Sequence, residues 1–222
     1  MRFTRQLSVL AALAVLPALA AAQRAKGAKS VSCAVRATDA WVKRQAEWFD
    51  DSKHDWTNDT LRTALLQAAG IAAPLQAPVQ FGVQVAGREP ALGPTADKMV
   101  AELEKLAAAR GSTWPTKSVV GAAGTHAVYL LAQRDTGFAR AVLHRMMEAG
   151  PAESPAVDVA TFEDHLRLVW GRKQIYGTQF HVGDNGKIVL APMEDSAHAD
   201  LRREDAALPP FKVGLCLANS GK

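Results

Sequence analysis

Two cysteines, Cys33 and Cys216, lie near opposite ends of this 222-residue chain and are its only ones. If they form a disulfide, the fold must bring the beginning and the end of its domain together. In the chain-entropy description, closing so long a loop stabilises a fold by about 4–5 kcal/mol. Disulfides persist in oxidising compartments, so the alternative of two separate buried thiols depends on where the protein resides. Neither cysteine lies in a motif that supplies a catalytic base.

The first 22 residues have the pattern of a secretory signal peptide. Arg2 and Arg5 form a positive n-region, and residues 7–19 form a short apolar h-region. Small residues that end at Ala20 or Ala22 fit a cleavage site. The alternative is a membrane anchor, but the apolar run is shorter than the about 20 residues that a spanning helix needs. We therefore expect a bacterial protein that is periplasmic or secreted, with no stable membrane anchor after cleavage.

Charge and motifs exclude several classes of function. The chain has 26 Lys and Arg against 22 Asp and Glu, and two of the basic residues leave with the leader. The remaining balance is close to neutral, so we expect no nucleic-acid partner. The six histidines form no metal-binding motif, and no cofactor is expected. The segment 121–126, GAAGTH, lacks the Lys-Ser/Thr ending of a phosphate loop, although its backbone amides would suit an anion at a helix start.

Residues 23–222 are expected to form a single globular domain of the α+β class, mostly helical. Apolar periodicity and capping residues predict helices at 35–51, 58–70, 95–111, 125–134, 138–150, 154–171 and 197–206. Asn58 or Asp59 is expected to cap the second helix, and the Ser154–Pro155 pair fits the start of the sixth. An apolar tail through Cys216 follows the last helix.

A small C-terminal β-hairpin is expected around the Asn185–Gly186 pair, which favours a tight turn. Its first strand would include residues 174–179, the word QIYGTQ. Upstream, residues 70–94 are rich in Ala, Pro and Gly. Within them, VQFGVQV at 79–85 alternates apolar and smaller residues, which predicts either a short strand or a flap on a mobile loop.

The C-terminal half resembles an uncharacterised bacterial family known only as a domain of unknown function. The matching words are TWPTKSVVG, LLAQRDTGF, EDHLRLVWGRKQIYGTQF and MEDSAHADLRREDAALPP. They make 95–222 the family-like part and 35–94 a variable N-terminal part. Two positions depart from the family pattern, since Arg134 replaces a histidine and His165 replaces an arginine. The resemblance implies an architecture and no reaction.

Polar side chains gather in and around the predicted strand at 174–179. Alternation places Gln174, Tyr176 and Thr178 on one face and Gln179 on the other. Neighbouring helices would add Gln133 and Asp164, the latter ten residues before Gln174 as in the family pattern. The candidate ligand-binding residues are Gln133, Gln174, Tyr176, Thr178 and Gln179, and the candidate acid/base residues are Asp164 and His165.

Two interpretations of these residues remain open. In the first, a satisfied polar network fixes how the hairpin docks on the helices, and the protein is a binding or interaction module of the cell envelope. Its partner would be a polar ligand or an envelope protein. In the second, the protein is a hydrolase or transferase that acts on a polar envelope substrate, with Asp164 or His165 moving a proton.

Overall fold

The computed structural model describes residues 33, 35, 39–71, 82–87, 91–109 and 114–220. All of them belong to one unit, Cys33–Lys222, which is separate from residues 1–32. The predicted signal peptide and its cleavage site lie outside the described residues. None of the described helices is both long enough and apolar enough to cross a membrane.

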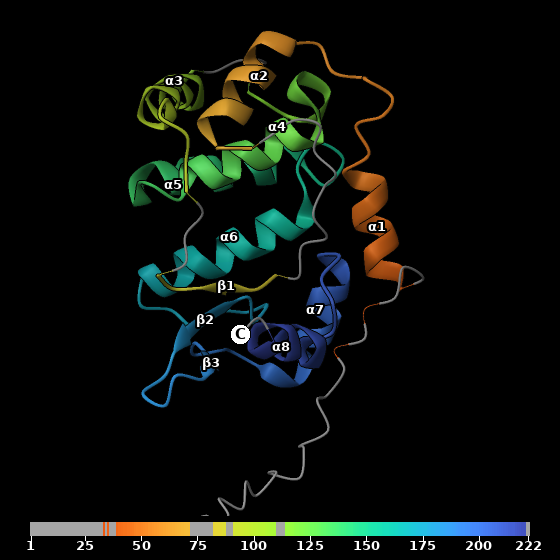
Figure 1. The fold of residues 1–222 in the computed structure, drawn as a ribbon, viewed down its shortest axis with the longest axis vertical. Coiled ribbons are helices and arrows are strands. Elements are labelled where there is room, and N and C mark those ends of the chain that lie inside the picture. The colour runs from red at the N-terminus through yellow and green to blue at the C-terminus, as the bar shows by residue number, and fades with distance from the viewer. Residues whose placement is uncertain are drawn as a thin grey trace, which may run out of the picture. The chain divides into compact units, whose positions relative to one another are not determined.

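The described residues form a mostly helical α+β fold, as the sequence predicts (Figure 1). The elements are α1 (Ala40–Trp48), α2 (Asp59–Ala68), β1 (Gln84–Val85), α3 (Ala96–Ala108), α4 (Lys117–Ala132), α5 (Thr136–Ala149), α6 (Ala156–Val169), β2 (Gln179–Val182), β3 (Ile188–Leu190), the 3₁₀-helix η1 (Ser196–His198), α7 (Ala199–Asp205) and α8 (Phe211–Ser220).

Helix boundaries follow the predicted caps in part. The Asn58 side chain accepts a hydrogen bond from the Leu61 backbone N–H at 2.9 Å and begins α2, which confirms the predicted cap. Val35, by contrast, is not helical, and α1 begins only at Ala40. The apolar tail is itself a helix, α8, because it has a sheet to pack against.

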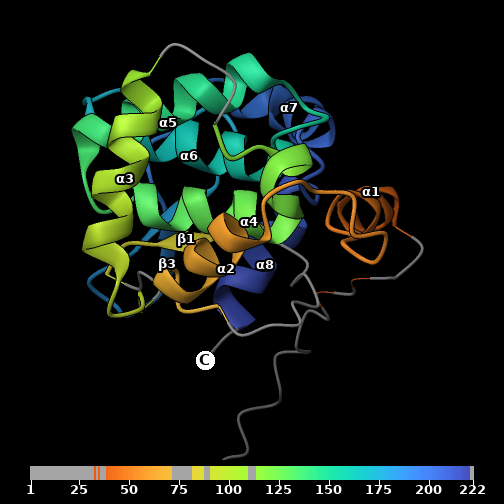
Figure 2. The ribbon, with the colours of Figure 1, turned by 90° about the horizontal axis from the view of Figure 1, so that it is seen from above.

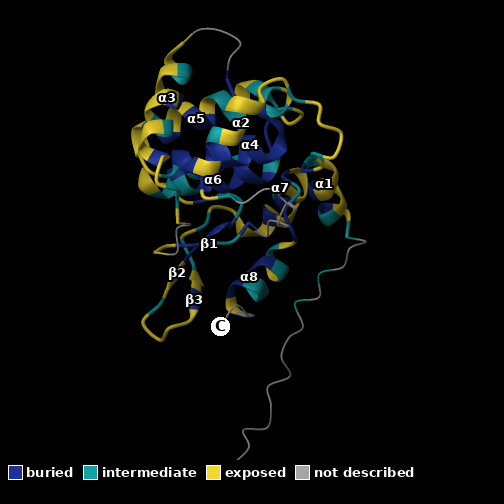
Figure 3. Cartoon of the chain, turned by 45° about the horizontal axis from the view of Figure 1, so that its top comes forward, coloured by how far each residue is buried: buried dark blue, intermediate teal, exposed yellow. Residues whose placement is uncertain are grey.

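Helices α2 to α6 share the main core. Its most buried side chains include Leu65, Leu103, Leu131 and Phe162. Figure 2 shows α2 and α3 beside α4, and Figure 3 shows that buried residues fill the middle of α4. Helix α6 packs against α5 and α4 and also touches β2. It therefore links the helical layer to the sheet.

A distant carboxylate determines where the regular part of α4 begins. Gly121 has a φ of +71°, which interrupts the helix after its first turn. The backbone N–H groups of Ala122 and Ala123 then donate to Asp51 at 2.8 and 3.2 Å. Asp51 also pairs with Arg62 at 2.8 Å. The anion that the GAAGTH segment was predicted to suit is thus a side chain of the protein itself.

Replacing Asp51 with alanine is expected to lower the free energy of unfolding by about 2 kcal/mol. The change removes a helix cap and leaves the half-buried Arg62 without its carboxylate. Urea unfolding measures the difference. Asp50→Ala is the matched control, since Asp50 is exposed and, within the part of the chain that the structure describes, its side chain bonds to its near neighbour Ser52. Equal unfolding midpoints for the two variants would contradict the capping role.

The sheet has the strand order β1-β2-β3. Strands β2 and β3 form the predicted hairpin, with Phe180 opposite Leu190. Residues 84–85 of the VQFGVQV word form β1, which pairs parallel to β2, while residues 79–81 lie outside the described residues. Helix α8 packs on the sheet through Ala218, which clusters with Phe180 and Ile188. The end of this segment, Gln84–Val85, is therefore a strand and not a flap.

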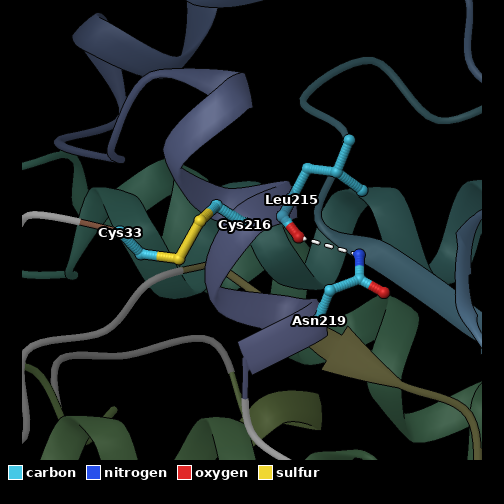
Figure 4. Close-up of a disulfide and its surroundings, with 4 residues drawn as sticks. All are labelled: Cys33, Leu215, Cys216 and Asn219. Carbon is cyan, nitrogen blue, oxygen red and sulfur yellow. Dashed lines mark hydrogen bonds between the residues drawn. A yellow bond between two sulfur atoms is a disulfide. The ribbon is translucent and has the colours of Figure 1, made fainter. Parts of the chain in front are cut away.

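Cys33 and Cys216 form a disulfide, as predicted (Figure 4). Their Cα atoms are 5.7 Å apart although 183 positions separate them in the sequence. The bond joins the start of the described chain to α8, where Asn219 donates a side-chain hydrogen bond to the Leu215 carbonyl at 3.0 Å. The alternative of two separate thiols is wrong.

Candidate functional site

The Asp164 carboxylate, fully buried in α6, organises the segment that was predicted to be a strand. One oxygen accepts the backbone N–H groups of Ile175 at 2.7 Å and Tyr176 at 3.1 Å. The other accepts the backbone N–H of Thr178 at 3.0 Å and its hydroxyl at 2.9 Å. Because these amides turn toward one carboxylate, residues 175–178 wrap around it and form no strand, and β2 begins only at Gln179. The strand prediction is wrong for 175–178 for this reason, while Gln174 makes an isolated β-bridge to Met193.

The two glutamines that flank this segment bond to each other and to the surrounding backbone. The Gln174 side chain donates to the carbonyls of Gln179 at 3.0 Å and Ala191 at 2.8 Å, and its oxygen accepts the Gln179 N–H at 2.9 Å. The Gln179 side chain donates to the Thr161 carbonyl at 3.0 Å. Both glutamines are buried. Their amide groups therefore serve the fold.

Arg203 holds the same segment from the opposite side. It is 0% exposed and donates to the carbonyls of Tyr176 at 2.8 Å and Gly177 at 3.1 Å. A third bond, at 2.6 Å, goes to the Pro209 carbonyl. Burial lowers the pKa of Arg203 to about 10, so the group stays charged at neutral pH. The sequence marks an arginine pair here, but its pattern does not show which member is buried.

The other two predicted site residues, Gln133 and His165, lie beside this network, and Gln133 reaches it through β1. Gln133 follows the end of α4 and accepts a hydrogen bond from the side chain of Gln84, whose backbone N–H donates to the Thr178 carbonyl at 2.8 Å. His165 lies next to Asp164 on α6 and is half-buried. The structure thus unites Asp164, Gln174, Thr178 and Gln179, together with the backbone of Tyr176.

The side chain of Tyr176 points to a different place, a cleft of about 310 Å³. The end of α5, the start of α6 and one side of α7 form its walls. The lining residues are Met146, Met147, Gly150, Pro151, Ser154, Ala156, Val159, Tyr176, Arg202, Asp205 and Ala206. Most of this lining is apolar, and its polar groups come from Ser154, Tyr176, Arg202 and Asp205. Sequence reasoning identified Tyr176 but not the cleft, because three separate helices build it.

Charges around the Tyr176 hydroxyl are mainly negative. Burial raises the pKa of Tyr176, and the nearby carboxylates of Glu163 and Asp164 raise it further. Arg202 opposes this effect, and Asp205 adds to it. Burial also raises the pKa of Glu163. Deprotonation of Tyr176 is therefore disfavoured, and the group acts as a neutral hydroxyl.

Ser154 is one of the residues that line the cleft, and it does not cap α6, contrary to the prediction. Pro155 occupies the capping position, and the Ser154 hydroxyl bonds to no backbone N–H of the helix. The residue is 1% exposed, and its hydroxyl has no hydrogen-bond partner among the described residues. A buried hydroxyl without a partner is uncommon in native proteins.

A buried His126–Asp158 pair joins α4 to α6. The His126 Nδ1 lies 2.8 Å from an Asp158 oxygen, and the ring packs between Phe49 and Tyr129. Burial, and then the charge of Asp158, raises the pKa of Tyr129 far above its ordinary range. His126 and Tyr129 share a face of α4 because they are three residues apart, but no local pattern in the sequence pairs His126 with Asp158. Among the residues that the structure describes, no three His, Cys, Asp or Glu side chains are grouped to hold a metal ion.

Comparisons with known proteins give a family and no activity. No curated protein and no solved structure matches the chain. A family model described as "Family of unknown function (DUF6624)" matches residues 63–220. The match runs from α2 to α8, so it begins upstream of the family-like part predicted from the sequence and leaves Cys33 outside. The chain belongs to this family of unknown function.

Proposed function

We propose that this protein is an exported binding module of the cell envelope, and that the cleft between α5, α6 and α7 is its ligand site. The main support is the position of Tyr176. Its backbone N–H donates to Asp164 and its carbonyl accepts from Arg203, while its side chain lines the cleft. The buried network therefore fixes one wall of an open cleft, which is the pre-organisation that a binding site needs.

Export to the periplasm or the outside fits two features. The disulfide is of the kind that persists in oxidising compartments. The N-terminal leader has the pattern of a secretory signal, as argued from the sequence. A polar ligand or an envelope protein is accordingly the expected partner.

The geometry favours binding over acid–base chemistry at Asp164. Each of its oxygens already accepts two hydrogen bonds from the surrounding segment. A general base needs an oxygen within hydrogen-bond reach of the substrate proton. Asp164 is buried behind the segment that it holds and is not among the residues that line the cleft.

An NMR titration with a panel of short peptides and soluble peptidoglycan fragments tests this proposal. We expect saturable shifts that concentrate on Ser154, Tyr176 and the Trp48 indole N–H, which donates to the carbonyl of the cleft residue Pro151 at 2.9 Å. Tyr176→Leu removes the ring and hydroxyl but keeps the backbone bonds. It is expected to weaken binding about tenfold or more, as for a central aromatic contact.

The matched control is His181→Leu, which changes an exposed ring on the hairpin. It should leave binding unchanged, and neither variant should lower the free energy of unfolding by more than about 1 kcal/mol. Shifts that concentrate away from the cleft, or chemical conversion of a panel member, would contradict the proposal.

A further inference from the structure

The cleft combines an apolar floor with a small set of hydrogen-bond acceptors. Met147, Ala156 and Val159 supply apolar surface that suits an alkyl chain. Three oxygen-bearing side chains line the same cleft, those of Ser154, Tyr176 and Asp205. A ligand that fills this cleft needs an apolar stem and a polar end.

The acceptors are not used by the protein itself. The Ser154 hydroxyl is buried without a partner among the described residues. Neither the Tyr176 hydroxyl nor the Asp205 carboxylate makes a hydrogen bond or ion pair within the described part of the chain. An ammonium group offers three N–H donors and no acceptor, which matches two hydroxyls and a carboxylate.

Arg202, the one basic residue in the lining, is already occupied. Its Nε donates to the Ile175 carbonyl at 2.9 Å, and its two terminal nitrogens bond to Asp195 at 3.2 and 2.6 Å. An anionic ligand would have to compete with the Asp195 carboxylate for this guanidinium. Asp205 has no such competitor among the described residues. Among the described residues that line the cleft, the charge without a partner is therefore the negative charge of Asp205.

We infer that the cleft recognises a primary ammonium group at the end of an apolar chain, as in a lysine side chain. The inference rests on the proposed function, because it names the ligand class of the same cleft. In this arrangement the alkyl stem lies against Met147 and Val159. The ammonium group donates to Asp205, Tyr176 and Ser154.

Three model compounds on the full-length mature protein test the inference by NMR. They are Nα-acetyl-lysine methylamide, its uncharged counterpart Nα-acetyl-norleucine methylamide, and Nα-acetyl-2-aminoadipate methylamide, which carries a carboxylate. At about 0.3 kcal/mol of binding free energy for each non-hydrogen atom, compounds this small bind with about millimolar affinity, so titrations must extend to tens of millimolar. We expect the lysine compound to bind at least about tenfold more tightly than either counterpart, as judged from the shifts of the cleft resonances. A charge-assisted hydrogen bond has an effect of this size.

Asp205→Asn is expected to weaken binding of the lysine compound about tenfold, and Ser154→Ala to weaken it to a smaller extent. The matched control is Glu204→Gln, which removes one negative charge from the same helix at a position outside the cleft lining. It should leave the affinity unchanged. Equal loss in Asp205→Asn and Glu204→Gln would show that only net charge matters and would overturn the inference.

Other outcomes test the class of ligand separately from the location of the ligand site. If the norleucine or aminoadipate compound binds the cleft as tightly as the lysine compound, the ammonium assignment is overturned while the cleft remains the ligand site. If none of the three compounds shifts the cleft resonances, the assignment is overturned as well, and the Tyr176→Leu experiment decides separately whether the cleft binds anything.

Discussion

Replacing Asp164 with asparagine is expected to lower the free energy of unfolding by about 3–5 kcal/mol. Asparagine keeps one acceptor oxygen and places an NH₂ donor where the other oxygen was. One pair of donors, either the Ile175 and Tyr176 amides or the two Thr178 groups, then loses its acceptor inside the core. The buried Arg203 also loses a nearby opposite charge. Urea unfolding monitored by circular dichroism measures the change.

Glu163→Gln is the control for this substitution, since it makes the same chemical change one position earlier on α6. Burial raises the pKa of Glu163, so folding disfavours its charged form and its neutral replacement should change stability by less than about 1 kcal/mol. Hydrogen exchange gives a second readout, because either the Ile175 amide or the Thr178 amide should lose protection in Asp164→Asn and neither should lose it in Glu163→Gln. Unchanged exchange at these two amides would contradict the organising role of Asp164.

Removing the disulfide is expected to have a similarly large effect. The double variant Cys33→Ala/Cys216→Ala should lose up to about 4–5 kcal/mol of unfolding free energy, because the cross-link restricts an unfolded loop of 183 positions. Wild-type protein in reductant should unfold at the same urea concentration as the double variant. Reductant should not affect the variant itself.

Hydrogen exchange at individual amides distinguishes a general loss of stability from a local loosening of α8. The amides of Phe180 and Ile188, on the strands that α8 covers, should exchange faster in the double variant. Identical urea midpoints for oxidised and reduced wild-type protein would show that the bond contributes nothing to stability.

The sequence predicts those features of the fold that arise from neighbouring residues. Asn58 and its apolar stripe predict α2, and the Asn185–Gly186 pair predicts the hairpin turn, where the Asn185 side chain accepts the Lys187 N–H at 3.0 Å. Helix caps, the spacing of apolar residues and turn-forming residues all act within a few positions of the chain. They can therefore be recognised in the sequence without a structure.

Features that depend on distant partners were missed. The start of α4 is fixed by Asp51, about 70 positions upstream, and no local pattern near Gly121 shows this. In the same way, the alternation of Gln174, Tyr176 and Thr178 predicts a strand, whereas the Asp164 carboxylate draws the backbone of this segment into a loop. A buried charge with four donors outweighs a local preference for extended structure.

The sequence predicts which residues lie together in the candidate site but not how they are arranged. Asp164, Gln174, Thr178 and Gln179 do lie together, yet as a closed network. Tyr176 alone reaches the cleft, because its backbone belongs to the network and its side chain points out of it. That cleft also needs α5 and α7, whose approach is a property of the whole fold.

The Cys33–Cys216 bond also has a mechanical consequence. A pulling force applied between the two ends of the chain would pass through the covalent bond at these residues, since everything from α1 to the first turn of α8 lies inside the loop that it closes. The helical core, the sheet and the cleft would then carry almost no tension. An oxidised molecule tethered at both ends should keep its cleft under loads that pull the reduced molecule apart.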